Sequence, residues 1–113
     1  MPSPSADSVL VHPVPVTDLH RAHAWYGDML RAIAAPDAAE VVAFLGTRVQ
    51  LTPGGQPSHE AVVIAVADCR SRYEALRERG VDFLTEPIER GSDTRCTFRD
   101  PDGNRFELRE VRG

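Results

Sequence analysis

Few side chains in this sequence are of types that catalyse reactions or bind metals, and most of these belong to no recognised sequence motif. The 113 residues include four histidines and two cysteines. Cys69 and Cys96 lack the Cys-x-x-Cys spacing of zinc knuckles and redox pairs, which favours two reduced thiols. His20 and His23 fall in a stretch of helical periodicity, where solvent exposure explains them. The strongest remaining candidate is a carboxylate, Glu107, which is surrounded in the sequence by arginines.

The first half of the chain predicts a strand, a helix and then strands that could position such groups. A β-branched run from Val9 to Val16 predicts a strand, and apolar residues at helical spacing from Leu19 to Leu30 predict a helix. Asp18 precedes that helix and is a suitable N-cap, because its carboxylate can accept from free N–H groups of the first turn. The later strands expected in this half cover residues 32–34, 40–45 and 47–52, with a hairpin at Gly46.

The second half repeats this order. A shift of 50 residues, from 14 to 64, superposes Val14–Asp18 on Ile64–Asp68. Asp68 is the second cap, and Gly80 is a natural end for a second helix. The strands expected here cover residues 61–66, 81–85, 93–99 and 104–111, with loops at 53–58 and 86–92 and a type I turn at 100–103. A single unit of one helix and its strands could not bury the apolar face of its own sheet. The two units must therefore share one hydrophobic core, which indicates an α+β fold.

Composition narrows the function classes further. The 13 basic and 17 acidic residues give a net charge of -4, and no basic run suits nucleic acid. No stretch approaches the length of a membrane span, and the residues before 8 lack the features of a signal peptide. We therefore expect a cytoplasmic protein without nucleic-acid or membrane partners, with a disordered tail at 1–7 and a single domain at 8–113.

Three segments resemble the glyoxalase, bleomycin resistance protein and extradiol dioxygenase (vicinal oxygen chelate) superfamily. They are residues 14–26, residues 66–81 and, most specifically, Asp-Pro-Asp-Gly-Asn followed by Phe-Glu-Leu within 100–108. The resemblance implies two tandem β-α-β-β-β modules, at about 8–55 and 59–113. These would form a curled mixed sheet with a cleft, with the helices on the outer face. It also implies a homodimer in which modules of two chains complete each cleft.

Metal-dependent members resembling this pattern take ligands from the first and fourth strands of each module. In this sequence those positions fall on Val11, Gln50, Ala61 and Glu107, of which only Glu107 is a good ligand. His12 is one residue out of register, so it should point away from the cleft unless a β-bulge turns it. His59 lies two residues before its matching position. We therefore expect no metal and no cofactor.

Side-chain alternation predicts which residues line the cleft. Small and apolar side chains there would leave room for a planar or hydrophobic organic molecule. Arg95, Thr97 and Arg105 could add recognition of an anion. The other residues expected on the cleft side are Val11, Pro13, Pro15, Arg48, Gln50, Thr52, Ala61, Val63 and Ala65.

Three functions remain open at this point. The first is metal-independent binding of a small, largely apolar or aromatic molecule, such as an antibiotic or metabolite that is sequestered. The second is a metal-dependent lyase, isomerase or dioxygenase that uses Glu107 with a displaced His12 or His59. The third is a metal-free enzyme on an aromatic or polyketide-like metabolite, with Glu107 as general base. Two alternative roles of Glu107 argue against catalysis. The carboxylate could be neutralised by Arg95, Arg105 or Arg109, or it could only orient a ligand by hydrogen bonding.

Overall fold

The computed structural model describes residues 11–35, 38–57 and 60–111, and the expected tail at 1–7 lies outside these ranges. The described residues form two helices, α1 and α2, and nine strands. In chain order the elements are β1 (Val11–Val16), α1 (Leu19–Leu30), β2 (Ile33–Ala35), β3 (Ala38–Phe44), β4 (Thr47–Pro53), β5 (Val62–Ala65), α2 (Cys69–Glu78), β6 (Asp82–Phe83), β7 (Ile88–Arg90), β8 (Asp93–Arg99) and β9 (Arg105–Val111). Neither helix has the length and apolar character needed to cross a membrane.

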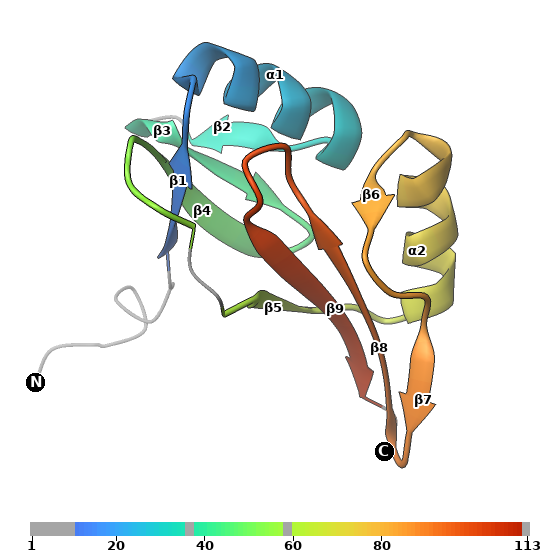
Figure 1. Cartoon of the computed structure of the whole chain (residues 1–113). Helices are drawn as coiled ribbons and strands as arrows, with labels where there is room; N and C mark the ends of the chain where they lie inside the picture. The colour runs from blue at the N-terminus through green and yellow to red at the C-terminus, as the bar shows by residue number, and fades with distance from the viewer. Residues whose placement is uncertain (1–10, 36–37, 58–59, 112–113) are drawn as a thin grey trace, which may run out of the picture.

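Two sheets of the same design make up the fold (Figure 1). In the first sheet the strand order is β1-β4-β3-β2, and in the second it is β5-β9-β8-β6. In each sheet the strand before the helix pairs in parallel with the last strand of its module, while the other pairs are antiparallel. α1 lies over the first sheet and α2 lies beside the second. The α+β fold with two β-α-β-β-β modules is therefore confirmed.

The second strand of module two is divided, which the sequence did not predict. Residues 86–92 were expected to form a loop, but Ile88–Arg90 pairs with β8 as β7, and Asp82–Phe83 pairs with β8 as β6. Between these two pieces, the backbone N–H groups of Leu84 and Thr85 both donate to the carbonyl of Thr97. All three side chains of β7 are exposed, so hydrogen bonding to β8 rather than burial holds this strand in place, and its sequence shows no hydrophobic pattern.

A single core joins the two modules. Phe106 on β9 is fully buried and stacks on Phe98, with 5.2 Å between ring centroids. The same ring contacts Phe44 of module one at 5.6 Å and Tyr26 of α1 at 6.1 Å. Aromatic pairs at such distances are stabilising beyond the area that they bury. The expectation that the two units share a core is confirmed.

Both helices begin at the expected caps. Asp18 accepts from the N–H of Arg21, and Asp68 accepts from the N–H of Ser71. α1 ends at Arg31, whose φ of 57° lies in the left-handed region that glycine occupies most easily. Its conformation allows the amide of Ala32 to reach the carbonyl of Tyr26 at 3.0 Å. An arginine rather than a glycine therefore occupies the left-handed position that ends this helix.

The turn at residues 100–103 holds a buried carboxylate. The N–H of Gly103 donates to the carbonyl of Asp100 at 3.0 Å, as expected for a β-turn there. The Asp100 side chain is buried and accepts from the Tyr26 hydroxyl at 2.6 Å. It also accepts from the backbone N–H of Asp102 and from the backbone and side chain of Asn104. Asp100 thus fastens the turn to α1 of the other module.

Three buried groups that can lose a proton, one hydroxyl and two thiols, determine how the free energy of unfolding changes at alkaline pH. Burial raises the pKa of the Tyr26 hydroxyl and of the Cys69 and Cys96 thiols, and Asp100 raises that of Tyr26 further. The folded protein therefore holds these protons more tightly than the unfolded chain, whose groups titrate near 9.0 and 10.0. Their stabilisation is fully present below pH 9 and is lost as pH rises, by up to about 1.4 kcal/mol per pH unit for each group. Urea unfolding from pH about 7 to about 10.5 measures this loss, and Tyr26→Phe should remove the part that begins at the tyrosine pKa.

Candidate functional site

The face of each sheet that points away from the helices is called here the open face. In β1, Val14 and Val16 are buried against the helical side, so Val11, Pro13 and Pro15 lie on the open face. Residues that pair across neighbouring strands form rows on this face. The first row is formed by Ile33, Ala43, Arg48 and Val11, and neighbouring pairs are Pro13 with Gln50 and Pro15 with Thr52.

The open face of the second sheet is more charged than that of the first. In β9, Phe106 and Leu108 are buried on the helical side, which places Arg105, Glu107 and Arg109 on the open face. One row across this sheet consists of Val63, Glu107 and Thr97, and the next consists of Ala65, Arg109, Arg95 and Ile88. Ala61 precedes β5 and is partly buried.

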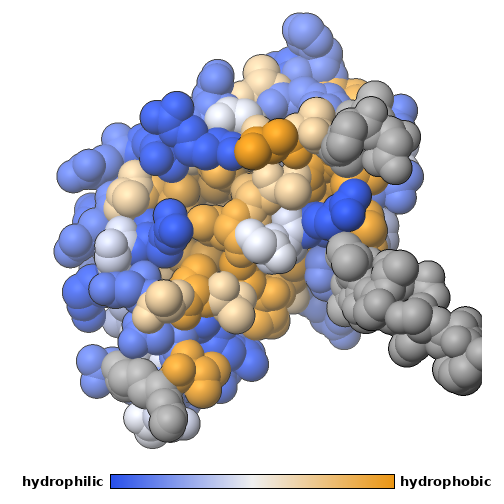
Figure 2. All heavy atoms as spheres, turned by 180° about the vertical axis from the view of Figure 1, so that it is seen from behind, coloured by the Kyte–Doolittle hydropathy of each residue, from blue (hydrophilic) through white to orange (hydrophobic). Residues whose placement is uncertain are grey.

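Figure 2 shows the surface of the molecule from behind, with hydrophobic side chains gathered across its middle and a hydrophilic border around them. Two large hydrophobic residues on the open face are exposed to solvent, with exposed fractions of 45% for Val63 and 73% for Ile33. The sequence did not identify Ile33, Ala43 or Ile88 as residues of this face, because their placement depends on register with strands far along the chain. No local signal in the sequence gives that register.

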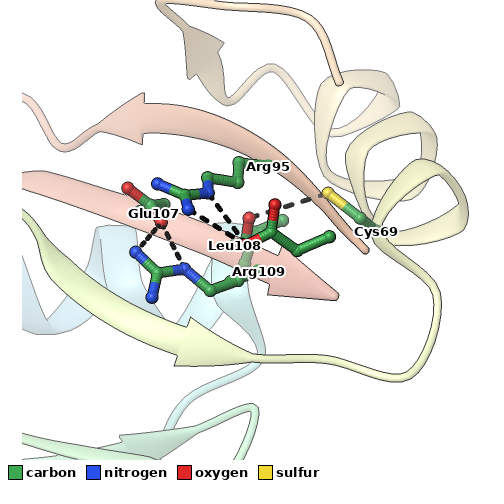
Figure 3. A network of polar contacts seen from close by, with 6 residues as sticks. Cys69, Arg95, Glu107, Leu108 and Arg109 are labelled. Carbon is green, nitrogen blue, oxygen red and sulfur yellow. Dashed lines mark hydrogen bonds and ion pairs between the residues drawn. The ribbon is translucent and has the colours of Figure 1, made fainter. Parts of the chain in front are cut away.

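Glu107 is held by an ion pair with Arg109. One oxygen of its carboxylate accepts from Nε of Arg109 at 2.8 Å and lies 2.7 Å from a terminal nitrogen of the same guanidinium (Figure 3). The Glu107 side chain is only 17% exposed, so this pair is partly shielded from water. Of the three arginines expected to neutralise Glu107, Arg109 does so directly. The geometry therefore holds the carboxylate in a fixed position.

A second ion pair lies beside the first. Arg95 donates to Asp93 at 3.0 and 3.3 Å on the neighbouring strand β8. The hydrogen bond to Asp93 and its charge raise the pKa of Arg95, and the negative charge of Glu107 adds to this effect. Arg95 and Arg109 lie directly opposite each other in the sheet. Two guanidinium groups, each with a carboxylate partner, therefore form the charged part of the open face.

The expected metal positions do not fit a divalent ion. The side chains of Val11 and Ala61 have no donor atoms, which leaves Gln50 and Glu107 as the two expected positions with an oxygen that could bind a metal. Among the described residues, no group of three or more His, Cys, Asp or Glu side chains could hold a metal. His12 lies on the helical side of β1, and the register of β1 with β4 runs without a bulge from 11 to 16. His59 lies outside the described residues.

Comparison with known proteins assigns the family. The model of the Glyoxalase/Bleomycin resistance protein/Dioxygenase superfamily matches residues 7–108, so the chain belongs to this superfamily. The uncharacterized protein YurT of Bacillus subtilis (strain 168) is 32% identical, in an alignment covering 56% of this chain and 59% of that protein. This chain thus spans less than two thirds of that relative's length.

Solved structures show the same fold. A superfamily member from Sphaerobacter thermophilus DSM 20745 is 25% identical with a TM-score of 0.71, covering 90% of this chain and 95% of that chain. The genomically encoded fosfomycin resistance protein FosX from Listeria monocytogenes is 18% identical with a TM-score of 0.68, covering 91% and 92%. At that identity the likeness concerns the fold alone. The family predicted from three short segments is confirmed.

Proposed function

We propose that this protein binds a small, largely apolar or aromatic organic molecule on its open face without the help of a metal ion. The observation that carries the proposal is the composition of that face. Mostly small or apolar rows on the first sheet, which include Arg48, accompany the two arginine–carboxylate ion pairs on the second, and the described residues contain no metal-ligand set. Apolar area would supply affinity, while Arg95, Arg109 and Thr97 would orient polar groups of the ligand.

Two further proposals concern the oligomeric state of the protein and its location in the cell. An open face gains depth when a second copy covers it, so we propose a homodimer whose two chains complete each cleft. We also propose that the protein works in the cytoplasm, where the two free cysteines stay reduced. The superfamily includes resistance proteins, and the fold of FosX is similar. Sequestration of an antibiotic or metabolite is consistent with this assignment.

Catalysis by Glu107 is the second candidate function. A carboxylate that is 17% exposed could remove a proton from a bound ligand. Its ion pair with Arg109 holds the carboxylate in place through one oxygen, Oε2, which receives both short contacts. Turnover of a bound compound that is lost in Glu107→Gln while binding persists would establish this role. Binding lost equally in Glu107→Gln would assign the residue to ligand orientation.

An aromatic anionic dye tests the binding function directly. Anilinonaphthalene sulfonate combines apolar rings with one negative charge, so it should bind saturably to the open face with enhanced fluorescence. Ala65→Asp places a carboxylate on the open face beside Arg109, and the dye's dissociation constant should rise on the order of tenfold. Ala24→Asp is the matched control, because Ala24 is exposed on α1, and it should leave binding unchanged.

The same titration in the presence of a chelator separates the metal-free and metal-dependent alternatives. Binding that is unchanged by the chelator is expected. Loss of binding on chelation, with stoichiometric divalent metal in the purified protein, would overturn the metal-free proposal. Equal weakening by Ala65→Asp and Ala24→Asp would show that the dye binds elsewhere.

A further inference from the structure

The two cysteines, which lie far apart in the sequence, meet behind the open face. Cys69 is the first residue of α2, and Cys96 lies in the middle of β8 on the side that faces this helix. Their sulfur atoms are 3.3 Å apart, and both side chains are buried, at 0% and 1% exposure. The Cys69 sulfur also lies 3.7 Å from the carbonyl oxygen of Leu108 on β9, toward which Figure 3 shows it directed. The thiols therefore touch each other inside the core.

This contact is close to the geometry of a covalent bond. A disulfide has a sulfur–sulfur distance near 2.05 Å, so the two atoms need to approach by about 1.3 Å. We propose that Cys69 and Cys96 form an intramolecular disulfide when the protein meets a small peroxide. The bond would tie the N-terminus of α2 to the centre of the second sheet. This inference rests on the thiol geometry and is independent of the proposed function.

The reaction balances with hydrogen peroxide as the oxidant. One cysteine, as its thiolate, attacks a peroxide oxygen, which breaks the O–O bond and gives a sulfenic acid and hydroxide. The second thiol then attacks the sulfenic sulfur, forming the S–S bond and releasing water. In total, two thiols lose two hydrogen atoms and one peroxide becomes two molecules of water. The neighbouring thiol captures the sulfenic acid before further oxidation because it is already in contact.

The surroundings of the pair make the reaction slow at neutral pH. Burial raises the pKa of both thiols, so few thiolates form. The backbone N–H of Cys69 donates to Oε1 of Glu110 at 2.8 Å, which holds the first turn of α2 against β9. Opening of this turn would admit peroxide and water. The rate should therefore increase with pH, on the order of tenfold per unit below the thiol pKa.

The position of the bond links it to the open face. Cys96 lies between Arg95 and Thr97 in β8, and its side chain points to the opposite side of the sheet. A disulfide would fix this part of β8 against α2, directly behind the charged row formed by Arg95 and Arg109. Oxidation would thus stiffen the support of that row without adding any atom to it.

Mass spectrometry of the full chain tests the inference. Reduced protein treated with hydrogen peroxide should lose the mass of two hydrogen atoms, and no disulfide should join one chain to another. A tryptic digest should contain the peptide Cys96–Arg99 joined to the peptide that ends at Arg70. Both changes should reverse with a thiol reductant. Two thiols that remain free at alkaline pH, gain of oxygen atoms without hydrogen loss, or chains linked to one another would each overturn the proposal.

A variant and a second measurement complete the test. In Cys96→Ala the remaining Cys69 has no partner, so the loss of two hydrogen atoms should disappear. If that variant does not fold, the oxidised and reduced forms of the unaltered protein can still be compared. The oxidised form should unfold at a higher temperature, because a disulfide restricts the unfolded chain. An oxidised form with a lower midpoint would show that the bond strains the native core, against the contact geometry described.

Discussion

Asp100→Ala is expected to lower the free energy of unfolding by about 3 to 5 kcal/mol. The carboxylate accepts four hydrogen bonds, from the Tyr26 hydroxyl, the Asp102 backbone and two groups of Asn104. Removing it takes the acceptor from the Tyr26 hydroxyl and from the backbone N–H groups of Asp102 and Asn104, and the buried donors cannot be fully solvated. The side-chain amide of Asn104 keeps only its hydrogen bond to the carbonyl of Pro15. Urea denaturation followed by circular dichroism measures the change.

Asp82→Ala is the matched control for this experiment. Asp82 also pairs with a neighbour, Arg99, at 2.8 Å, but its side chain is 60% exposed and that of Arg99 is 52% exposed. Such a pair contributes little, so the variant should remain within about 1 kcal/mol of the unaltered protein. Similar losses for the two aspartates would contradict the structural role assigned to Asp100.

Phe106→Ala should destabilise the protein by about 3 to 5 kcal/mol and leave a single unfolding transition. The ring of Phe106 is fully buried and contacts aromatic rings of both modules, so its loss creates a cavity at their junction. Because the modules share one core, neither should remain folded when the other unfolds. Calorimetry measures both the stability and the number of transitions.

Phe83→Ala provides the comparison for the aromatic core. Phe83 is partly buried at the edge of the same cluster and contacts Tyr73 at 4.7 Å and Phe98 at 5.4 Å. Within the described part of the chain Phe83 has no aromatic contact in module one, so Phe83→Ala should cost clearly less than Phe106→Ala. Two separate transitions in Phe106→Ala would show that the modules hold independent cores, which would contradict the arrangement described.

Much of the architecture follows from local signals in the sequence. Asp18 and Asp68 mark both helix starts because short carboxylates satisfy free amides, and the internal repeat gives the order of elements. The turn at 100–103 also follows from its residue types. β7 could not be predicted in this way, because Ile88–Arg90 is specified by pairing with β8 rather than by a pattern of its own. The left-handed conformation of Arg31 at the end of α1 is likewise not indicated by its residue type, because glycine is the residue that favours this conformation.

The candidate site was predictable in part. Strand alternation gives the face on which Val11, Gln50 and Glu107 lie, because the period of two is fixed by backbone geometry. The choice of Arg109 as the partner of Glu107 was not predictable, since three arginines have comparable positions in the sequence. The contact of Cys69 with Cys96 was also missed. Local cysteine spacing carries no information about thiols that meet across a helix and a sheet.

The two prolines of β1 have a consequence for the outer edge of the first sheet. β1 is an edge strand, and Pro13 and Pro15 have no N–H group to offer to a further strand. The carbonyl of Pro15 is already occupied, because the side-chain amide of Asn104 donates to it at 2.8 Å. Another chain therefore cannot continue the sheet by regular backbone pairing along this border. Strand-by-strand aggregation is blocked there, and any neighbour must meet β1 through side chains.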